Sequence, residues 1–192
     1  MKKLDNILVN VSTKSIIGSV EKSINHLTFD SRSVTDSSVF IAINGTVVNG
    51  HDYIQKAIDL GALVIVCEVL PSALNSEVTY IQVADSNEAL AQMASNFYDN
   101  PSSKLKLTGV TGTNGKTTVA TLLFNLFTQA GFKVGLLSTV KVMIGTEEFP
   151  ATHTTPDSIS INKYLAEMVE AGCDYCFMEV SSHGIAQKRT DA

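Results

Sequence analysis

The stretch Gly109-Val-Thr-Gly-Thr-Asn-Gly-Lys-Thr-Thr118 decides how this chain is interpreted. The apolar run before it, Leu105–Val110, is typical of a short β-strand, and Lys116–Ala130 after it has the pattern of a helix that Gly131 would end. A strand, a glycine-rich turn and a helix N-terminus form an anion site, because backbone N–H groups and the helix dipole face the same point. We therefore predict that the loop binds the phosphates of a nucleotide, ATP being the first choice.

The residues of this loop suit phosphate binding. Gly112 and Gly115 allow the backbone to approach the phosphates closely, and Lys116 can reach the β- and γ-phosphates. The hydroxyl of Thr117 can bind Mg²⁺. The match to the pattern G-x-x-x-x-G-K-[ST] is imperfect, because Val110 stands at the first glycine position. A turn whose glycines serve only the backbone is the alternative, and the flanking strand and helix speak against it. The predicted ATP-binding residues are Gly112, Thr113, Asn114, Gly115, Lys116, Thr117 and Thr118.

A second functional residue is expected at the end of the apolar strand Tyr175–Met178. Glu179 follows this strand directly, as an acidic residue often does beside a phosphate loop. A magnesium site needs more oxygen ligands than one hydroxyl, so Glu179 is the candidate second ligand beside Thr117. The alternative is a carboxylate that caps a local turn with Ser181 and Ser182. We predict Lys116 and Glu179 as the catalytic residues.

Strand and helix patterns alternate from residue 50 onward, which indicates an α/β fold. The polar, proline-bearing break Asn100–Lys104 predicts a boundary between two domains, 1–103 and 104–192. The second would be the first part of a P-loop-type α/β domain, because such domains need more strands than remain before Ala192. We expect helices over 53–60, 86–98 (capped by Ser86), 116–130 and 159–170, and strands over 63–67, 79–83, 105–110, 133–137 and 175–179.

Composition limits the classes of function. The net charge of −5 and scattered basic residues offer no field for a polyanion, so nucleic acid is not expected as a partner. The first ten residues contain no apolar stretch long enough for a signal peptide, and the apolar runs elsewhere are far shorter than the roughly 20 residues that a membrane helix needs. We expect a cytoplasmic protein without a membrane partner.

Cys173 and Cys176 form a single C-x-x-C motif. A redox or metal site is one interpretation, but residues three apart on a strand point to opposite faces. We therefore predict that both thiols pack in the core.

The loop Thr111–Thr118 resembles that of the Mur ligases and of their relative folylpolyglutamate synthase, ATP-dependent enzymes that form amide bonds. About a hundred residues precede the loop, which fits the synthase poorly. Among these residues, Phe29–Val34, Val39–Ala42, Gly45 and Asn49–Tyr53 look like a uridine-nucleotide-binding domain of Mur ligases. Two later motifs, His153–Asp157 and Met178–Gly184, are similar to the ligase that adds the third residue of the peptidoglycan peptide.

The resemblance implies roles for matching positions. Contacts to the uridine and diphosphate of the precursor would come from Phe29, Ser31, Thr46, Val47 and Val48. Contacts to its muramoyl-peptide part would come from His153, Thr154, Thr155, Ser181, Gln187 and Arg189. His153 departs from the amide expected there, and His183 receives no role. Thr117 and Glu179 would be the magnesium ligands.

The resemblance also implies a reaction. ATP would phosphorylate the free carboxylate of UDP-N-acetylmuramoyl-L-alanyl-D-glutamate, and a diamino acid, meso-diaminopimelate rather than L-lysine, would displace phosphate from the acyl phosphate. ATP and Mg²⁺ are the expected cofactors, and a monomer the expected state. The family's C-terminal domain and carbamylated lysine would lie past Ala192, so the chain alone is expected to be inactive. Two other readings stay open: a P-loop ATPase or GTPase with a regulatory N-terminal half, and a non-catalytic module that binds the UDP-precursor.

Overall fold

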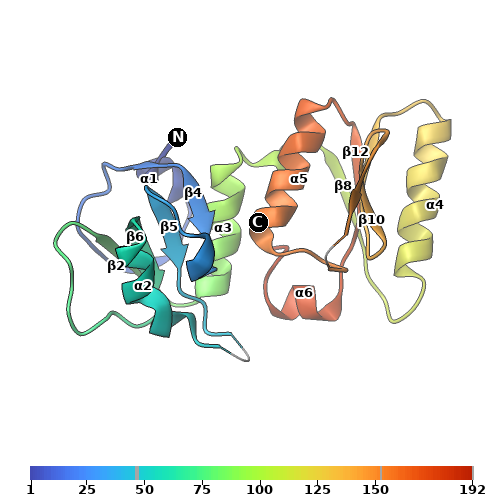
Figure 1. The fold of residues 1–192 in the computed structure, drawn as a ribbon. Helices are drawn as coiled ribbons and strands as arrows, with labels where there is room; N and C mark the ends of the chain where they lie inside the picture. Colours follow the sequence, from blue (N-terminus) through green and yellow to red (C-terminus); the bar gives the residue numbers. More distant parts are fainter. Residues whose placement is uncertain (46–47, 152, 192) are drawn as a thin grey trace. The chain divides into compact units, whose positions relative to one another are not determined.

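The computed structural model describes residues 1–45, 48–151 and 153–191. It divides into two compact units, Met1–Phe97 and Tyr98–Ala192. Each unit combines a β-sheet that contains parallel strands with helices (Figure 1), which confirms the predicted α/β class. Within the described residues, none of the helices combines the length and apolar character needed to cross a membrane.

The first unit contains a five-stranded sheet in the order β2-β7-β6-β5-β4. The strands from β7 to β4 run parallel, and β2 pairs antiparallel with β7 at one edge. The middle strand β6 is an unbroken apolar run, as expected for a strand covered on both faces. Each buried Val or Ile in it stabilises the fold by about 1.5–3 kcal/mol. The bounds are Thr13–Ile17 for β2, His26–Thr28 for β4, Ser38–Ile41 for β5, Ala62–Cys67 for β6 and Thr79–Val83 for β7.

Short helices connect β4 to β5 and β5 to β6. The chain leaves the carboxyl ends of the parallel strands β4, β5 and β6 at one edge of the sheet, so the three segments that follow them are neighbours there. The remaining elements of the unit are β1 (Lys2–Lys3), α1 (Leu4–Ile7), β3 (Ser23–Ile24), η1 (Ser31–Ser33), η2 (Gly50–Tyr53), α2 (Ile54–Asp59) and α3 (Ser86–Phe97).

The predicted cap of helix α3 is wrong. Ser86 is the first residue of the helix, and the acceptor for the orphan N–H groups lies one residue earlier. Asp85 Oδ1 accepts from the N–H groups of Asn87 at 2.9 Å and Glu88 at 3.0 Å. The hydroxyl of Ser86 instead donates to Glu68 Oε1 at 2.8 Å, so a tertiary contact uses the group that would have capped the helix.

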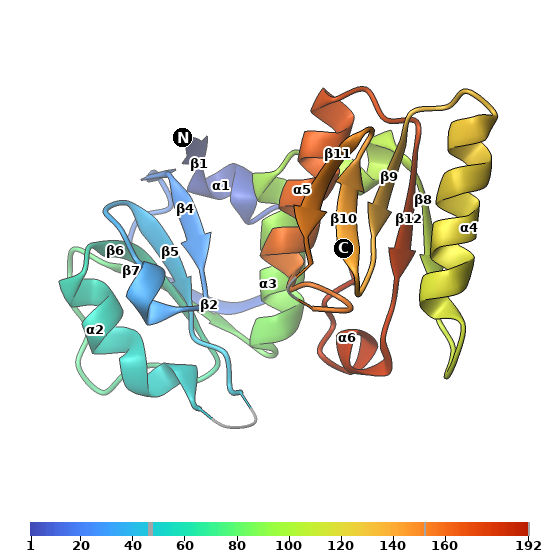
Figure 2. The ribbon, with the colours of Figure 1, turned by 45° about the vertical axis from the view of Figure 1, so that its right-hand side comes forward.

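The second unit contains a five-stranded sheet in the order β11-β10-β9-β12-β8. The strands β8 (Lys106–Val110), β12 (Tyr175–Glu179) and β9 (Val134–Leu137) are parallel. Helix α4 (Lys116–Gln129) packs on one face of this sheet and α5 (Ser158–Glu170) lies on the other (Figures 1 and 2). Strand β12, between β9 and β8, contributes to both faces, because Phe177 packs in the cluster beneath α4 whereas Met178 packs in the cluster beneath α5.

Three parts of the second unit differ from the sequence-based prediction or were not foreseen. The hairpin of β10 (Lys141–Ile144) and β11 (Glu147–Pro150) extends the sheet antiparallel to β9, with Gly145 at a positive φ in its turn. A short helix, α6 (Ser182–Ala186), follows β12. The helix η3 (Pro101–Lys104) contacts α5 and therefore belongs to the second unit. The border between the two units lies between Phe97 and Tyr98, a few residues before the predicted boundary at 103/104.

The three cysteines are buried, which confirms the prediction for Cys173 and Cys176, but the geometric reason given for these two is wrong. Cys173 precedes strand β12, and both residues lie in the same core cluster rather than on opposite faces. Burial raises the pKa of the Cys176 thiol, and the neighbouring Cys173 raises that pKa further. Burial also raises the pKa of Cys67, to about 11. All three thiols are therefore core groups held in the protonated form.

Candidate functional site

The phosphate loop connects strand β8 to helix α4 at the carboxyl edge of the second sheet. Gly112 and Gly115 have φ values of 146° and 83°, in the region that favours glycine, so both glycines are required by the backbone. Gly115 is the N-cap of α4 and supplies no capping side chain. The first N–H groups of this 14-residue helix are therefore available to an anion, as phosphate binding requires.

Lys116 lies over this loop. Its ammonium group donates a hydrogen bond of 2.8 Å to the carbonyl oxygen of Gly112, so the side chain folds back across the turn. The ammonium group therefore lies beside the backbone of the predicted phosphate loop.

Glu179 is the buried carboxylate of the site. Its side chain is 1% exposed, although strand β12 ends there. The carboxylate accepts from the Thr117 hydroxyl at 2.9 Å, the Thr139 N–H at 2.8 Å and the Thr139 hydroxyl at 3.2 Å. These three donors are neutral groups, so the contacts that they make with the Glu179 carboxylate are hydrogen bonds and not ion pairs.

Thr139 was not foreseen from the sequence. It follows strand β9, whose carboxyl end lies beside that of the parallel neighbour β12. The signal that could have found it is this position: a hydroxyl residue just after a buried strand adjacent to the phosphate-loop strands. Its backbone and side chain both bind Glu179, which makes it the third side chain of the carboxylate cluster.

The oxygen atoms of Thr117, Thr139 and Glu179 are hard ligands, the type that Mg²⁺ prefers. The donor set therefore fits magnesium, with phosphate oxygens and water completing its shell. Within the described ranges, His, Cys, Asp and Glu side chains form no group of three or more that could hold a metal ion.

A second polar cluster joins the loop before α5 to helix α6. The buried hydroxyl of Thr155 donates to the carbonyl oxygen of Glu179 at 3.1 Å and accepts from the N–H of Ser181 at 2.9 Å. The Ser181 hydroxyl accepts from the N–H of Gly184 at 3.0 Å and so caps α6. Gly184 must lack a side chain, because a Cβ would lie 2.8 Å from Thr155 Cγ2.

Arg189 closes this cluster. Its Nε and Nη2 donate to Gln187 Oε1 at 2.9 and 2.6 Å, and its Nη1 donates to the carbonyl oxygen of Thr155. The structure therefore brings together four of the residues predicted to contact the muramoyl-peptide: Thr155, Ser181, Gln187 and Arg189. His153, which is exposed, and Thr154, which is half-buried, precede Thr155 in the same loop.

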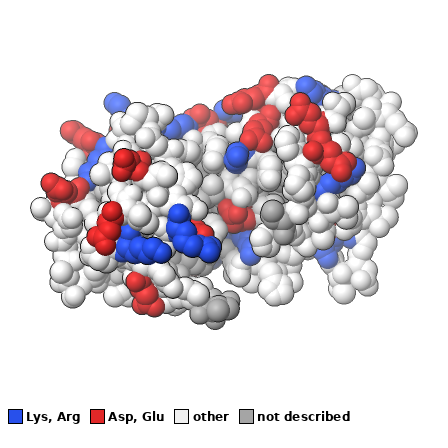
Figure 3. Space-filling model, in the orientation of Figure 1, with Lys and Arg blue, Asp and Glu red and all other residues white. Residues whose placement is uncertain are grey.

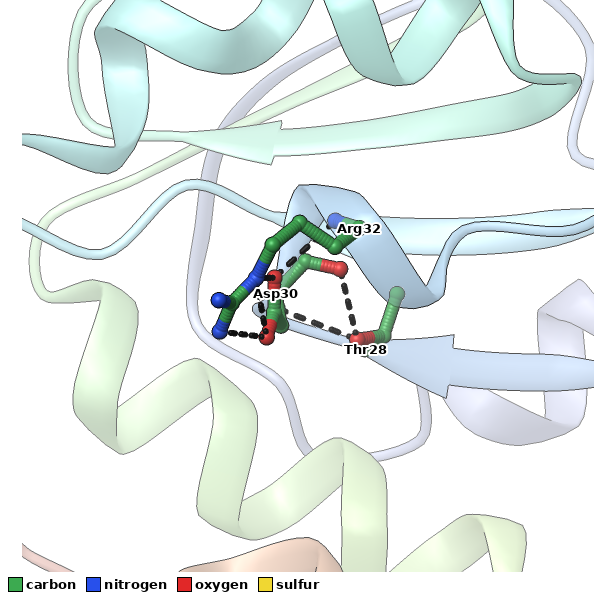
Figure 4. A network of polar contacts seen from close by, with 3 residues as sticks. All are labelled: Thr28, Asp30 and Arg32. Carbon is green, nitrogen blue, oxygen red and sulfur yellow. Dashed lines mark hydrogen bonds and ion pairs between the residues drawn. The ribbon is translucent and has the colours of Figure 1, made fainter.

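The first unit carries the residues expected to contact a uridine nucleotide. After strand β4, Asp30 and Arg32 form a compact network with Thr28 (Figure 4). Asp30 Oδ1 accepts from the N–H and Nε of Arg32, both at 2.9 Å, and the Thr28 hydroxyl accepts from the Asp30 N–H at 3.0 Å. The side-chain and backbone hydrogen bonds from Arg32 lower the pKa of Asp30.

The two predicted residues Phe29 and Ser31 are the chain neighbours of Asp30 in this network. Phe29 presents a ring that is 40% exposed, whereas Ser31 is buried at the start of η1. Val48, in the segment after β5, is 51% exposed. Thr46 and Val47 lie outside the described residues. On the face drawn in Figure 3, acidic and basic side chains are interspersed, without a broad field of either sign.

Two family models match the chain. Residues 23–98 match the model "Mur ligase family, catalytic domain", and residues 110–192 match "Mur ligase middle domain". The curated relatives include proteins named UDP-N-acetylmuramoyl-L-alanyl-D-glutamate--2,6-diaminopimelate ligase. The protein of that name from Phocaeicola vulgatus is 50% identical, and the one from Bacteroides fragilis 53% identical, each over 187 residues. These residues are 97% of this chain and 39% of each relative, so the chain spans about two fifths of the relatives' length.

Solved structures share the fold. A structure of a ligase of the same name superimposes with a TM-score of 0.78 at 22% identity, covering 98% of this chain and 37% of the other. A MurF ligase from Thermotoga maritima in complex with ADP has a TM-score of 0.55 at 23% identity, covering 82% and 32%. At such identities the likeness supports the fold alone.

Proposed function

Because this chain belongs to the Mur ligase family, we propose that it takes part in the ATP-dependent joining of a diamino acid to UDP-N-acetylmuramoyl-L-alanyl-D-glutamate. The observation that carries the proposal is the carboxylate cluster: Glu179 bound to Thr117 directly beside a phosphate loop. The names of the relatives favour 2,6-diaminopimelate as the diamino acid over L-lysine.

In the first step, the free carboxylate of the D-glutamyl residue attacks the γ-phosphorus of ATP, and ADP leaves. Loop N–H groups and the ammonium of Lys116 bind the phosphates and offset the charge that develops on the transferred group. Thr117 and Glu179, with Thr139 beside them, would hold Mg²⁺, which would neutralise phosphate charge. The residues supply positioning and electrostatic stabilisation.

In the second step, the amine attacks the carbonyl carbon of the acyl phosphate. The new C–N bond forms as phosphate leaves, and the amine loses a proton. Thr155, Ser181 and Arg189 orient the muramoyl-peptide, because a guanidinium can bind a carboxylate or phosphate through two parallel hydrogen bonds. To do so, Arg189 would exchange its contact with Gln187 for one to the ligand.

The first unit would bind the uridine and diphosphate. Phe29 offers an exposed aromatic face beside the rigid turn of Asp30 and Arg32, and Ser31 lies within this turn. Val48, with Thr46 and Val47, would complete the contacts. A monomeric, cytoplasmic protein without a nucleic-acid or membrane partner stays a prediction.

Calorimetric titration of the 192-residue chain tests the proposal. UDP-N-acetylmuramoyl-L-alanyl-D-glutamate and MgATP are titrated separately into the wild type, Ser31→Ala and Lys116→Ala. We expect Ser31→Ala to lose affinity for the precursor only, and Lys116→Ala to lose affinity for ATP only. A P-loop NTPase with a regulatory half would bind ATP but not the precursor, whereas a non-catalytic module would bind only the precursor. Either result would contradict the proposal.

A further inference from the structure

The sequence contains three Asn–Gly pairs, which are Asn44–Gly45, Asn49–Gly50 and Asn114–Gly115. Asparagine is chemically labile, and a following glycine favours its deamidation because no Cβ obstructs attack by the glycine nitrogen. All three asparagines are exposed, so exposure does not distinguish the pairs. The difference lies in the backbone N–H of the glycine, which must be able to turn towards the asparagine side chain and lose its proton.

In the first unit, both glycine N–H groups are engaged. The N–H of Gly45 donates to the carbonyl oxygens of Ile43 and Val48, each at 3.1 Å. The N–H of Gly50 donates to the carbonyl oxygen of Ile43 at 2.8 Å. Neither glycine nitrogen can attack the preceding side chain without first breaking these hydrogen bonds, so we expect both pairs to be protected.

The pair in the phosphate loop lacks this protection. Within residues 1–45, 48–151 and 153–191, the N–H of Gly115 and the side chain of Asn114 make no hydrogen bond. A Cβ built on Gly115 would meet no heavy atom within 4 Å beyond its chain neighbours, so there is open space beside this backbone. Gly115 is also the N-cap of α4, and the positive end of the helix dipole stabilises negative charge on its nitrogen as the proton leaves.

We propose that Asn114–Gly115 is a site of spontaneous deamidation in the folded protein, and that the product weakens nucleotide binding. The Gly115 nitrogen attacks Cγ of Asn114 and forms a new C–N bond. The bond from Cγ to the side-chain nitrogen breaks, and that nitrogen leaves as ammonia with the Gly115 proton. Water then opens the cyclic imide at one of its two carbonyl carbons, which gives aspartate or isoaspartate. The reaction needs no oxidant or reductant.

The product places a carboxylate in the phosphate loop. Position 114 comes directly before the N-cap of α4, and a helix N-terminus stabilises a carboxylate as it does a phosphate. The new charge would therefore occupy the positive end of the helix and repel the phosphates of ATP. Isoaspartate would also insert an extra carbon into the main chain between Gly112 and Gly115, whose φ values shape the loop. This effect on nucleotide binding rests on the proposed function.

Peptide mapping of the aged native chain tests the site. Trypsin releases Asn114 in the peptide Leu107–Lys116 and the other two asparagines in Ser33–Lys56, so fragment masses locate each amide-to-acid change. After incubation in mildly alkaline buffer, we expect Asn114 to be converted at least about tenfold faster than Asn44 or Asn49, which react only after local opening. In denaturant the three rates should become similar. Equal rates in the native protein, or no conversion of Asn114, would overturn the inference.

The affinity for MgATP tests the consequence. Fresh and aged wild type are titrated by calorimetry, together with a fresh Asn114→Asp variant that carries the charge of the product. We expect Asn114→Asp and the converted fraction of the aged sample to bind MgATP at least about tenfold more weakly than fresh wild type. Asn114→Gln, whose longer side chain closes a ring far more slowly, should keep its own starting affinity on ageing. Saturating MgATP should slow the conversion of Asn114, because phosphate then engages the loop N–H groups.

The two hypotheses fail differently. If fresh wild type does not bind MgATP, the proposed function is wrong, and the deamidation is decided by the peptide map alone. If fresh wild type binds MgATP and both Asn114→Asp and the aged sample bind it equally well, the effect on nucleotide binding is wrong. The thermal unfolding midpoint of each sample separates a loss of affinity from a loss of fold.

Discussion

The hydroxyl of Thr117 donates a 2.9 Å hydrogen bond to the carboxylate of Glu179, a residue 62 positions later in the chain. Strand pairing makes this contact possible, because β8 and β12 run parallel with Val110 opposite Glu179. Both proposed magnesium ligands are therefore adjacent before a nucleotide arrives. The Thr117 hydroxyl must turn its proton away from Glu179 when its oxygen binds the metal.

Removing the charge of Glu179 should weaken binding of MgATP much more than binding of ATP alone. The Glu179→Gln variant keeps the size of the side chain and can still accept from the Thr139 N–H. We expect at least about tenfold lower affinity for MgATP, and little change in the presence of EDTA. Calorimetry under both conditions checks this. Equal weakening with and without the metal would mean that Glu179 acts only on the fold of the loop.

Thr139 should matter through its hydroxyl as well as through its backbone. Thr139→Val removes the 3.2 Å hydrogen bond to Glu179 and retains the N–H bond of 2.8 Å. We expect affinity for MgATP to fall about threefold to tenfold, since one hydrogen bond to a charged group is lost. Thr139→Ser, which keeps the hydroxyl, is the matched control and should bind as the wild type does. If valine and serine behave alike, the hydroxyl has no role.

Asp30 should titrate below the ordinary range of aspartate. Hydrogen bonds from the side chain and backbone of Arg32 lower its pKa in the folded protein. Ionised Asp30 therefore contributes to the free energy of unfolding. This contribution is complete above the unfolded pKa of about 3.9, and it is lost as the pH falls through the lower folded pKa. In an NMR titration, Arg32→Ala should raise the pKa of Asp30 part of the way, because the backbone bond remains. High salt should raise it too, since the Arg32 side chain is 81% exposed. A pKa that neither change moves would contradict this account.

The thiols should resist modification in the native state. Burial raises the pKa of Cys67 to about 11 and also raises the pKa values of Cys173 and Cys176. At pH 8 the reactive thiolate is therefore scarce and shielded. We expect Ellman's reagent to react only as fast as the protein opens, and to count three thiols in denaturant. Rapid reaction of one thiol in the native protein would indicate a cysteine outside the core.

The sequence by itself determined the features that depend on neighbouring residues. The glycines of the phosphate loop, the helix that begins at Lys116 and the apolar strand before Glu179 are local patterns, and the structure has all three. The order of motifs along the chain was enough to indicate the family. Turn geometry and side-chain periodicity depend on a few neighbouring residues, so they can be predicted from the sequence without knowledge of the fold.

Tertiary structure alone decided which distant groups meet. Thr139 reaches Glu179 only because β9 and β12 are neighbours in the sheet, and no local pattern specifies strand order. Ser86 gives its hydroxyl to Glu68 and leaves the cap to Asp85, a competition settled by packing. His51 likewise accepts hydrogen bonds from the N–H groups of Glu68 and Val69, which follow strand β6 and lie 17 and 18 residues later in the chain. Such contacts depend on long-range pairing, whose free energy comes from burial of whole strands rather than from the residues that touch.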